Sequence, residues 1–161
     1  MKITFIQTGG TIDKHYPHTI KGWAFEIHDP AFDRVLERLN PSFEYEVLSA
    51  LKKDSLEITE EDRAHLKQVI LDSGSDRIVI THGTDTMEET AKYLADLDKT
   101  IVITEAMRPE RFSNSDADIN IGMAIATVQT AKSGVYICMH GWVMRHDEVD
   151  RNMESGQYLK G

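Results

Sequence analysis

Small, hydroxyl-bearing and acidic residues follow four predicted strands, and their types could support nucleophilic catalysis. The four segments are Thr8-Gly9-Gly10-Thr11-Ile12, Lys53-Asp54-Ser55-Leu56-Glu57, His82-Gly83-Thr84-Asp85-Thr86 and Glu105-Ala106-Met107-Arg108-Pro109. A hydroxyl nucleophile needs a neighbouring group that activates it and N–H donors that hold the developing oxyanion. Two threonines, an aspartate and the backbone N–H groups of a glycine-rich loop could supply both needs without a cofactor.

The order of these segments in the chain predicts that they lie together. Ligands of parallel α/β sheets bind outside the carboxyl ends of the strands, where loops and helix N-termini converge. Each of the four segments directly follows a predicted strand. We therefore expect one functional site at the carboxyl edge of the sheet.

Each segment taken alone also has a purely structural interpretation. Gly9-Gly10 is compatible with a tight turn, Ser55 with a capped turn, and Thr84-Asp85 with a helix N-cap. Phosphate binding is disfavoured, because the G-x-G-x-x-G and G-x-x-x-x-G-K patterns are both absent. The seven histidines show no metal-ligand or triad-like spacing. We therefore expect no metal, and we expect His82 to be a neutral hydrogen-bonding residue of the structure.

Alternating apolar runs and amphipathic segments predict the elements that position the site. We expect strands at residues 2–7, 43–50, 77–81, 100–104 and 135–139, and helices at 29–39, 59–70, 87–94 and 115–131. Strands that alternate with helices at this spacing favour a mainly parallel sheet covered on both faces. The predicted fold class is α/β, a three-layer αβα arrangement of the Rossmann or flavodoxin-like type, in a single domain over residues 1–161.

The ends of these elements are predicted from local signals. Asp29-Pro30 is typical of an N-cap followed by proline at the first helical position. Thr59 with Asp62 resembles a capping box. Residues 12–28 are expected to form a loop, and the charged tail from Asp147 to Gly161 is expected to be partly loose.

Composition excludes several classes of partner. The formal net charge is -9 and no basic run occurs, so nucleic acid is not an expected partner. No apolar stretch reaches membrane-spanning length and the N-terminus does not resemble a signal peptide, so no membrane partner is expected. The single cysteine, Cys138, cannot form an internal disulfide, which fits a reducing compartment. We expect a cytoplasmic protein.

Three motifs in order resemble the N-terminal domain of the bacterial-type L-asparaginases and glutaminase-asparaginases. They are Thr8 to Ile12, the eleven residues Ile80 to Thr90, and Ala106 to Pro109 with Ser115-Asp116-Ala117 and Asn120 behind it. The resemblance extends to about Met139. It implies an amidohydrolase that converts L-asparagine, or a related small amide, to aspartate and ammonia with neither cofactor nor metal.

The resemblance also implies roles for individual residues. Thr11 matches the nucleophilic threonine, and Thr84 matches a second catalytic threonine that works with an aspartate and a lysine. Asp85 matches that aspartate, which in the family also binds the α-ammonium of the substrate. Tyr16 is the nearest candidate for the tyrosine that orients the nucleophile from a flap. Further substrate contacts are expected from Gly10, from Ser55 to the α-carboxylate, and from the backbone carbonyl of Ala106.

The sequence departs from the family in several places. Family members are longer and carry a second domain, which we expect this chain to lack. The loop after the first strand is short, so Tyr16 is closer to Thr11 than the family tyrosine is. The family lysine aligns onto Ala131, and Lys132 beside it is our candidate for the catalytic lysine; the alternative is a solvated lysine at a helix C-terminus. Glu105 replaces the usual glycine and would bring a negative charge near the substrate carboxylate unless it points away.

Three functions compete at this point. The first is an active amidase of the asparaginase type, and the second is a catalytically silent homologue that binds or senses an amino acid. The third, without the resemblance, is a nucleotide-binding α/β domain, which the missing phosphate-loop patterns disfavour. Retention of Thr11, Thr84 and Asp85 together favours the first. We also expect a homodimer, because the loops around Tyr16 and the helix near Ser115 would otherwise leave apolar surface exposed.

Overall fold

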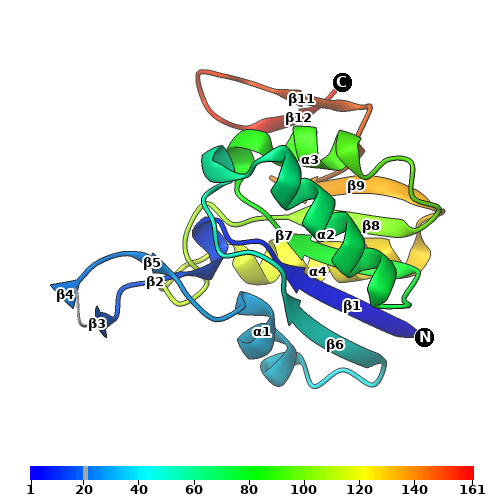
Figure 1. Cartoon of the computed structure of the whole chain (residues 1–161). Coiled ribbons are helices and arrows are strands. Elements are labelled where there is room, and N and C mark those ends of the chain that lie inside the picture. Colours follow the sequence, from blue (N-terminus) through cyan, green and yellow to red (C-terminus); the bar gives the residue numbers. More distant parts are fainter. Residues whose placement is uncertain (20–21) are drawn as a thin grey trace.

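The centre of the molecule is a six-stranded sheet, seen in a computed structural model that describes residues 1–19 and 22–161 (Figure 1). Its strands are β1 (Lys2–Gln7), β6 (Glu44–Ser49), β7 (Arg77–Thr81), β8 (Thr100–Thr104), β9 (Gly134–Met139) and β10 (Trp142–Arg145). The order across the sheet is β10-β9-β8-β7-β1-β6. All neighbours are parallel except β9 and β10, which are antiparallel. The predicted, mainly parallel α/β sheet is confirmed.

Helices cover both faces of this sheet (Figure 1). The first face carries α1 (Ala31–Leu39) and α4 (Ala117–Thr130), and the second carries α2 (Glu60–Asp72) and α3 (Met87–Tyr93). Side chains alternate between the faces of a strand, so β1 contributes Phe5 to the core beneath α1 and α4 and Ile6 to the core beneath α2 and α3. The helices of the described residues include none that is both long and apolar enough to cross a membrane.

The helix ends show which local signals were sufficient. The predicted capping box begins α2: the Asp62 N–H donates to Thr59 Oγ1 at 3.2 Å, and the Thr59 N–H donates to Asp62 Oδ2 at 2.9 Å. The predicted cap of α1 is wrong by one residue, because Pro30 is the N-cap and no side chain of its own segment caps it. The distant Asp13 carboxyl accepts from the Ala31 N–H at 2.7 Å instead.

Part of the segment predicted as a loop forms a projecting arm. β2 (Lys14–His15) pairs with β5 (Glu26–Ile27), and β3 (His18–Thr19) pairs with β4 (Gly22–Trp23), both antiparallel. Residues 20 and 21 of the predicted loop lie outside the described residues. We call residues 14–19 and 22–27 the aromatic arm, because the Tyr16 ring packs 5.6 Å from that of Trp23 and 5.0 Å from that of Phe25.

The prediction of a partly loose C-terminal tail is wrong. β11 (Val149–Arg151) and β12 (Tyr158–Lys160) form an antiparallel pair, which we call the C-terminal hairpin. It lies over the α3 side of the molecule (Figure 1). Tyr158 anchors it, since its side chain belongs to the core beneath α2 and α3 and the residue is only 1% exposed. One buried aromatic residue thus orders a segment whose local sequence is weakly patterned.

Candidate active site

Three short 3-10 turns lie at the carboxyl edge of the sheet, one after each of β1, β6 and β7. They span Thr11–Asp13, Ser55–Glu57 and Thr84–Thr86. Ser55 joins the second turn to the third, because its hydroxyl accepts from the Asp85 N–H at 3.2 Å and its carbonyl accepts from the Thr86 hydroxyl at 2.8 Å. The loops that we expected to share an edge are therefore in direct contact.

Two glycines permit these turns to approach each other closely. Gly10 has φ +95°, and a Cβ placed on it would lie 2.7 Å from the backbone nitrogen of Gly83. A Cβ on Gly83 would lie 2.8 Å from Ser55 Oγ. A side chain at either position would collide with its neighbour. Thr11 and Thr84, which follow the two glycines, are thereby held on the same edge with partly exposed side chains.

Glu105 lies inside this edge, and its carboxyl group binds backbone N–H groups. Oε1 accepts from Ile12 at 2.6 Å and from Ala106 at 2.8 Å, and Oε2 accepts from Thr11 at 3.1 Å. Burial raises the pKa of Glu105 well above its ordinary value of 4.5, while the three N–H donors act in the opposite direction. Glu105 therefore points beneath the Thr11–Asp13 turn and away from solvent.

Asp13 is a second buried carboxyl on the same turn, and the sequence analysis did not identify it. It accepts from the Ala31 N–H at 2.7 Å and from the Thr81 hydroxyl at 2.9 Å. Burial raises its pKa to about 6 despite these hydrogen bonds. An aspartate directly after an apolar residue in a glycine-rich turn is the only signal that the sequence offered for it.

The C-terminal hairpin brings a cation to Thr84 and Asp85. Arg151 Nη2 lies 3.4 Å from Thr84 Oγ1, and Nη1 lies 3.3 Å from the Thr84 carbonyl oxygen and 3.5 Å from Asp85 Oδ1. The Tyr158 hydroxyl donates to the same carbonyl at 2.6 Å, and the guanidinium of Arg151 lies 5.4 Å from the centre of its ring. Both residues belong to the tail that we predicted to be loose, so the sequence analysis missed them.

The prediction that Lys132 joins the site is wrong. α4 starts behind the loop that follows β8 and ends at the amino edge, where Gly134 of β9 is paired with Thr100 at the beginning of β8. Lys132 is exposed in this connection, and Ala131, onto which the family lysine was aligned, is the C-cap of α4. Both residues therefore lie at the end of the sheet opposite Thr84.

Two other predicted residues have contacts of a different kind. The Tyr16 side chain is exposed on the aromatic arm, where the ring contacts that the structure gives it are with Trp23 and Phe25. Ala106 is buried directly after β8, and its N–H is bound to the side chain of Glu105. Of the predicted site, the structure thus brings Gly10, Thr11, Ser55, Thr84, Asp85 and Ala106 to one edge.

His82 has the structural environment that we predicted for it. Its Nδ1 lies 2.8 Å from the Gly83 carbonyl oxygen and its Nε2 lies 2.7 Å from Thr90 Oγ1. Arg63 Nε donates to the same hydroxyl at 3.1 Å, so the Thr90 hydroxyl donates onward to Nε2 and the ring proton is on Nδ1. Burial lowers the pKa of His82 to about 4, which keeps the ring neutral.

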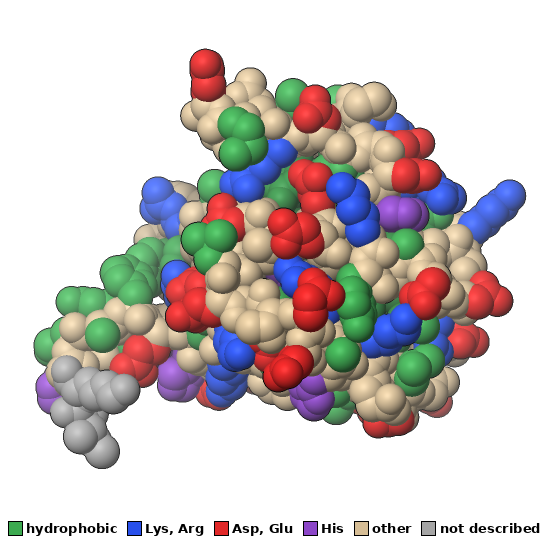
Figure 2. All heavy atoms as spheres, turned by 45° about the horizontal axis from the view of Figure 1, so that its top comes forward, with side chains coloured by type: hydrophobic (Ala, Val, Ile, Leu, Met, Phe, Trp, Pro, Cys, Tyr) green, Lys and Arg blue, Asp and Glu red, His purple; other side chains and the backbone are tan. Residues whose placement is uncertain are grey.

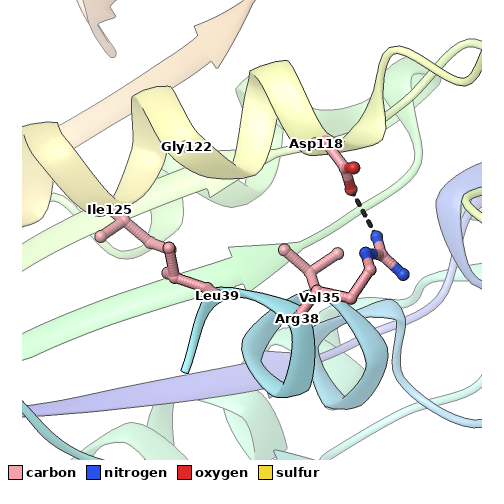
Figure 3. Close-up of a pocket in the computed structure, with 6 residues that line it drawn as sticks. All are labelled: Val35, Arg38, Leu39, Asp118, Gly122 and Ile125. Atoms are coloured by element: carbon pink, nitrogen blue, oxygen red, sulfur yellow. Dashed lines mark hydrogen bonds and ion pairs between the residues drawn. The ribbon is translucent and has the colours of Figure 1, made fainter. Parts of the chain in front are cut away.

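A groove between α1 and α4 lies apart from the predicted residues. It has a volume of about 260 Å³, and Val35, Leu39 and Ile125 supply most of its apolar wall (Figure 3). An ion pair between Arg38 and Asp118 bounds it, with 2.7 Å between Nη2 and Oδ1. None of the residues that we predicted for catalysis or substrate binding lines this groove.

A comparison with protein families identifies the chain. The family model described as "Asparaginase, N-terminal" matches residues 2–156. The chain belongs to the asparaginase family. This membership supports an amidohydrolase function and agrees with the three motifs that carry the resemblance.

Curated relatives share the family but are longer. The chain is 34% identical over 134 residues to an L-asparaginase of Bacillus licheniformis, which covers 78% of this chain and 41% of that protein. It is 28% identical over 164 residues to a glutaminase-asparaginase of Acinetobacter glutaminasificans, covering 94% and 50%. A shorter match, 35% over 89 residues, is to one subunit of a glutamyl-tRNA(Gln) amidotransferase of Methanococcus vannielii, covering 53% and 20%.

Solved structures of asparaginases have the same fold over almost the whole chain. The thermostable L-asparaginase from Thermococcus kodakarensis superposes with a TM-score of 0.82 at 25% identity, covering 99% of this chain and 51% of that one. A probable cytoplasmic L-asparaginase from Campylobacter jejuni gives 0.79 at 26% identity, covering 99% and 52%. The chain therefore spans about half the length of these relatives.

Proposed function

We propose that this protein is an amidohydrolase of the L-asparaginase type, which hydrolyses L-asparagine or a related small amide. The observation that carries the proposal is the meeting of Gly10 and Gly83, which holds the hydroxyls of Thr11 and Thr84 at one edge of the sheet. Amide hydrolysis by a hydroxyl nucleophile needs such a pair, in which one group attacks and the other belongs to the activating system. Family membership supports the same chemistry.

The proposed reaction has two steps. In the first, Thr11 Oγ1 bonds to the side-chain amide carbon of the substrate, the C–N bond breaks, and the hydroxyl proton leaves with the nitrogen as ammonia. In the second, water cleaves the acyl-threonine ester, which releases the carboxylic acid and restores the Thr11 hydroxyl. With L-asparagine the products are aspartate and ammonia, and no cofactor or metal enters either step.

The substrate would be held by the residues around the two threonines. In this proposal Asp85 binds the α-ammonium, Ser55 the α-carboxylate, and Gly10 and the Ala106 carbonyl line the amide end. Asp85 is exposed and Ser55 is nearly buried beside it, which fits one charged and one enclosed contact. These assignments follow the family motifs residue by residue.

Arg151 takes the place of a catalytic lysine in this proposal. Its guanidinium lies within hydrogen-bonding distance of both Thr84 and Asp85. An arginine holds its proton throughout the pH range of protein function, whereas a lysine can release one. Arg151 can therefore orient Thr84 and stabilise the charge of Asp85, but it cannot accept the proton of a threonine. This difference is the specific observation that favours the second candidate function, a silent homologue that binds an amino acid without turnover.

We further propose a cytoplasmic homodimer whose contact surface includes the aromatic arm. Trp23 and Phe25 are 64% and 58% exposed, and hydrophobic side chains line this projection in Figure 2. Phe112 continues the surface, with its ring 5.7 Å from that of Phe25. Multi-angle light scattering at high micromolar concentration should give twice the monomer mass, and a monomer there would contradict the assembly.

An ammonia-release assay combined with calorimetry distinguishes the two candidate functions. Purified protein is incubated with L-asparagine, D-asparagine, L-glutamine and acetamide, and ammonia is measured by a coupled enzyme reaction. The amidase predicts release from at least one amino-acid amide and none from acetamide, which lacks the charged groups that Ser55 and Asp85 bind. Heat of binding with L-aspartate, but no ammonia from any amide, would instead identify the binding homologue.

A further inference from the structure

The carboxyl group of Glu105 occupies a backbone site that would otherwise be open to an external anion. Three N–H groups, those of Thr11, Ile12 and Ala106, converge on its two oxygens. Converging backbone N–H groups form a general binding site for anions. Glu105 is 1% exposed, and within residues 1–19 and 22–161 no lysine, arginine or histidine nitrogen lies within ion-pair distance of it.

The space for this carboxyl group depends on Gly10. A Cβ added to Gly10 would overlap Glu105 Oε2. Glu105 reaches this position from the end of β8, passing over the end of β7 to the turn that follows β1, because β7 lies between β8 and β1 in the sheet. The side chain is thus a strut between two loops that are far apart in the sequence.

Two buried carboxyl groups fix the Thr11–Asp13 turn at its two ends. Glu105 binds the N–H groups of Thr11 and Ile12, and Asp13 binds the Ala31 N–H and the Thr81 hydroxyl. The side chain of Thr11 is left partly exposed above them. Nucleophiles act best when the supporting residues hold them in the reactive geometry before the substrate binds.

We propose that Glu105 is a positioning residue for Thr11, acting as a built-in anion on the N–H groups of the Thr11–Asp13 turn. It does not contact the substrate. Its effect on turnover rests on the proposed function, whereas its effect on the turn does not. A glutamine at this position would keep one accepting oxygen but present an NH₂ group toward an N–H donor, and alanine would leave the three donors without this acceptor.

Amide hydrogen exchange followed by NMR tests the effect on the turn. Glu105→Ala should accelerate exchange at Thr11 and Ile12 by at least about tenfold, with little change in the core strands. Sodium formate at tens of millimolar should restore protection by filling the vacated anion site. Glu57→Ala, which removes an exposed carboxylate from the neighbouring Ser55–Glu57 turn, should leave both amides unchanged. If Glu105→Ala does not fold, Glu105→Gln should still weaken protection at these two amides. Wild-type exchange at both amides in the folded variant would overturn the proposal.

Kinetics then test the consequence for Thr11. Glu105→Gln should lower kcat for ammonia release by about tenfold or more with KM nearly unchanged, and formate should raise kcat of Glu105→Ala while it only inhibits the wild type. An unchanged kcat in a variant whose Thr11 amide is deprotected would overturn the positioning role. A wild-type protein without ammonia release would reject the proposed function, and the exchange experiment would still decide whether Glu105 holds the turn.

Discussion

The two ends of the parallel sheet treat ionisable groups in opposite ways. At the carboxyl end, Asp13, His82 and Glu105 are buried and bound mainly to backbone groups and hydroxyls. At the amino end, Lys2 pairs with Glu46 at 2.8 Å, and both side chains are about one-third exposed or more. The carboxyl end therefore contains groups whose charge is costly, and the amino end contains groups that water solvates at little cost.

This difference shows where the molecule gives up stability. Burial without an ion pair shifts the pKa of Asp13, Glu105 and His82 toward their neutral forms, which costs folding free energy at pH values where the unfolded chain would ionise. Natural proteins commonly keep such arrangements where function requires them. Substitutions at the carboxyl end should therefore change activity and pH dependence, whereas matched substitutions at the amino end should change little.

The largest difference between the two ends is expected from Thr11→Ala and Lys132→Met. Removing the proposed nucleophile should lower kcat for ammonia release by at least about a thousandfold, because the covalent route is lost. Lys132→Met should retain wild-type kcat, since Lys132 is exposed at the amino end. Circular dichroism would show that both variants are folded. More than a tenth of wild-type activity in Thr11→Ala would contradict the nucleophile assignment.

The second expected difference is in the pH dependence of stability, measured by urea unfolding between pH 4 and 7. Asp13 has a folded pKa of about 6 against an ordinary 3.8, so between these values the folded state keeps a proton that the unfolded state has lost. Its stability contribution is full below pH 3.8 and is lost as the pH rises through 6, by roughly 3 kcal/mol. Asp13→Asn should remove this loss, so its stability relative to wild type should rise over this range.

His82 should have the opposite dependence, which gives this prediction its control. Its pKa is lowered from 6.5 to about 4, so as the pH falls below 6.5 the unfolded state binds a proton that the folded state does not. Stability therefore falls toward pH 4, and in the wild type the two residues largely offset each other between pH 4 and 6. Asp13→Asn should reveal the His82 slope. A difference between variant and wild type that does not vary with pH would show that Asp13 titrates normally.

A smaller effect is expected from Arg151→Met, compared with Arg145→Met. The first removes the guanidinium beside Thr84 and Asp85 and should lower kcat/KM by roughly 10- to 100-fold. The second removes an exposed arginine that pairs with Asp147 on the same part of the chain, and should be nearly silent. Arg151→Lys should retain more activity than Arg151→Met, because it keeps a cation. Equal losses from the two methionine variants would place Arg151 outside the site.

The smallest effect is expected from Lys2→Met at the amino end. The ion pair with Glu46 is partly exposed, and such pairs contribute less than about 1 kcal/mol to stability. Urea unfolding should show a loss within that limit, and added salt should reduce it further. A loss above about 2 kcal/mol would mean that the amino end is not the tolerant region that its exposure suggests.

The sequence alone determined the elements and the edge on which the chemistry gathers. The capping box of Thr59 and Asp62, the strands of the sheet and the loops that follow them depend on residues a few positions apart, where periodicity and side-chain type act directly. The error on Lys132 was avoidable from the same information. In a β-α-β unit a helix begins at the carboxyl edge and returns the chain to the amino edge, so residues at its end cannot join a site at its beginning.

Only the tertiary structure decided what surrounds the two threonines. Arg151 reaches Thr84 across 67 positions of sequence, and Glu105 reaches Thr11 across 94. Whether such residues meet depends on the order β8-β7-β1 and on the burial of Tyr158, which anchors the C-terminal hairpin. A local pattern records which face of an element is apolar, but it does not record which distant backbone N–H groups a buried carboxyl will find. Those partners are fixed when the sheet assembles and every buried polar group must be satisfied at once.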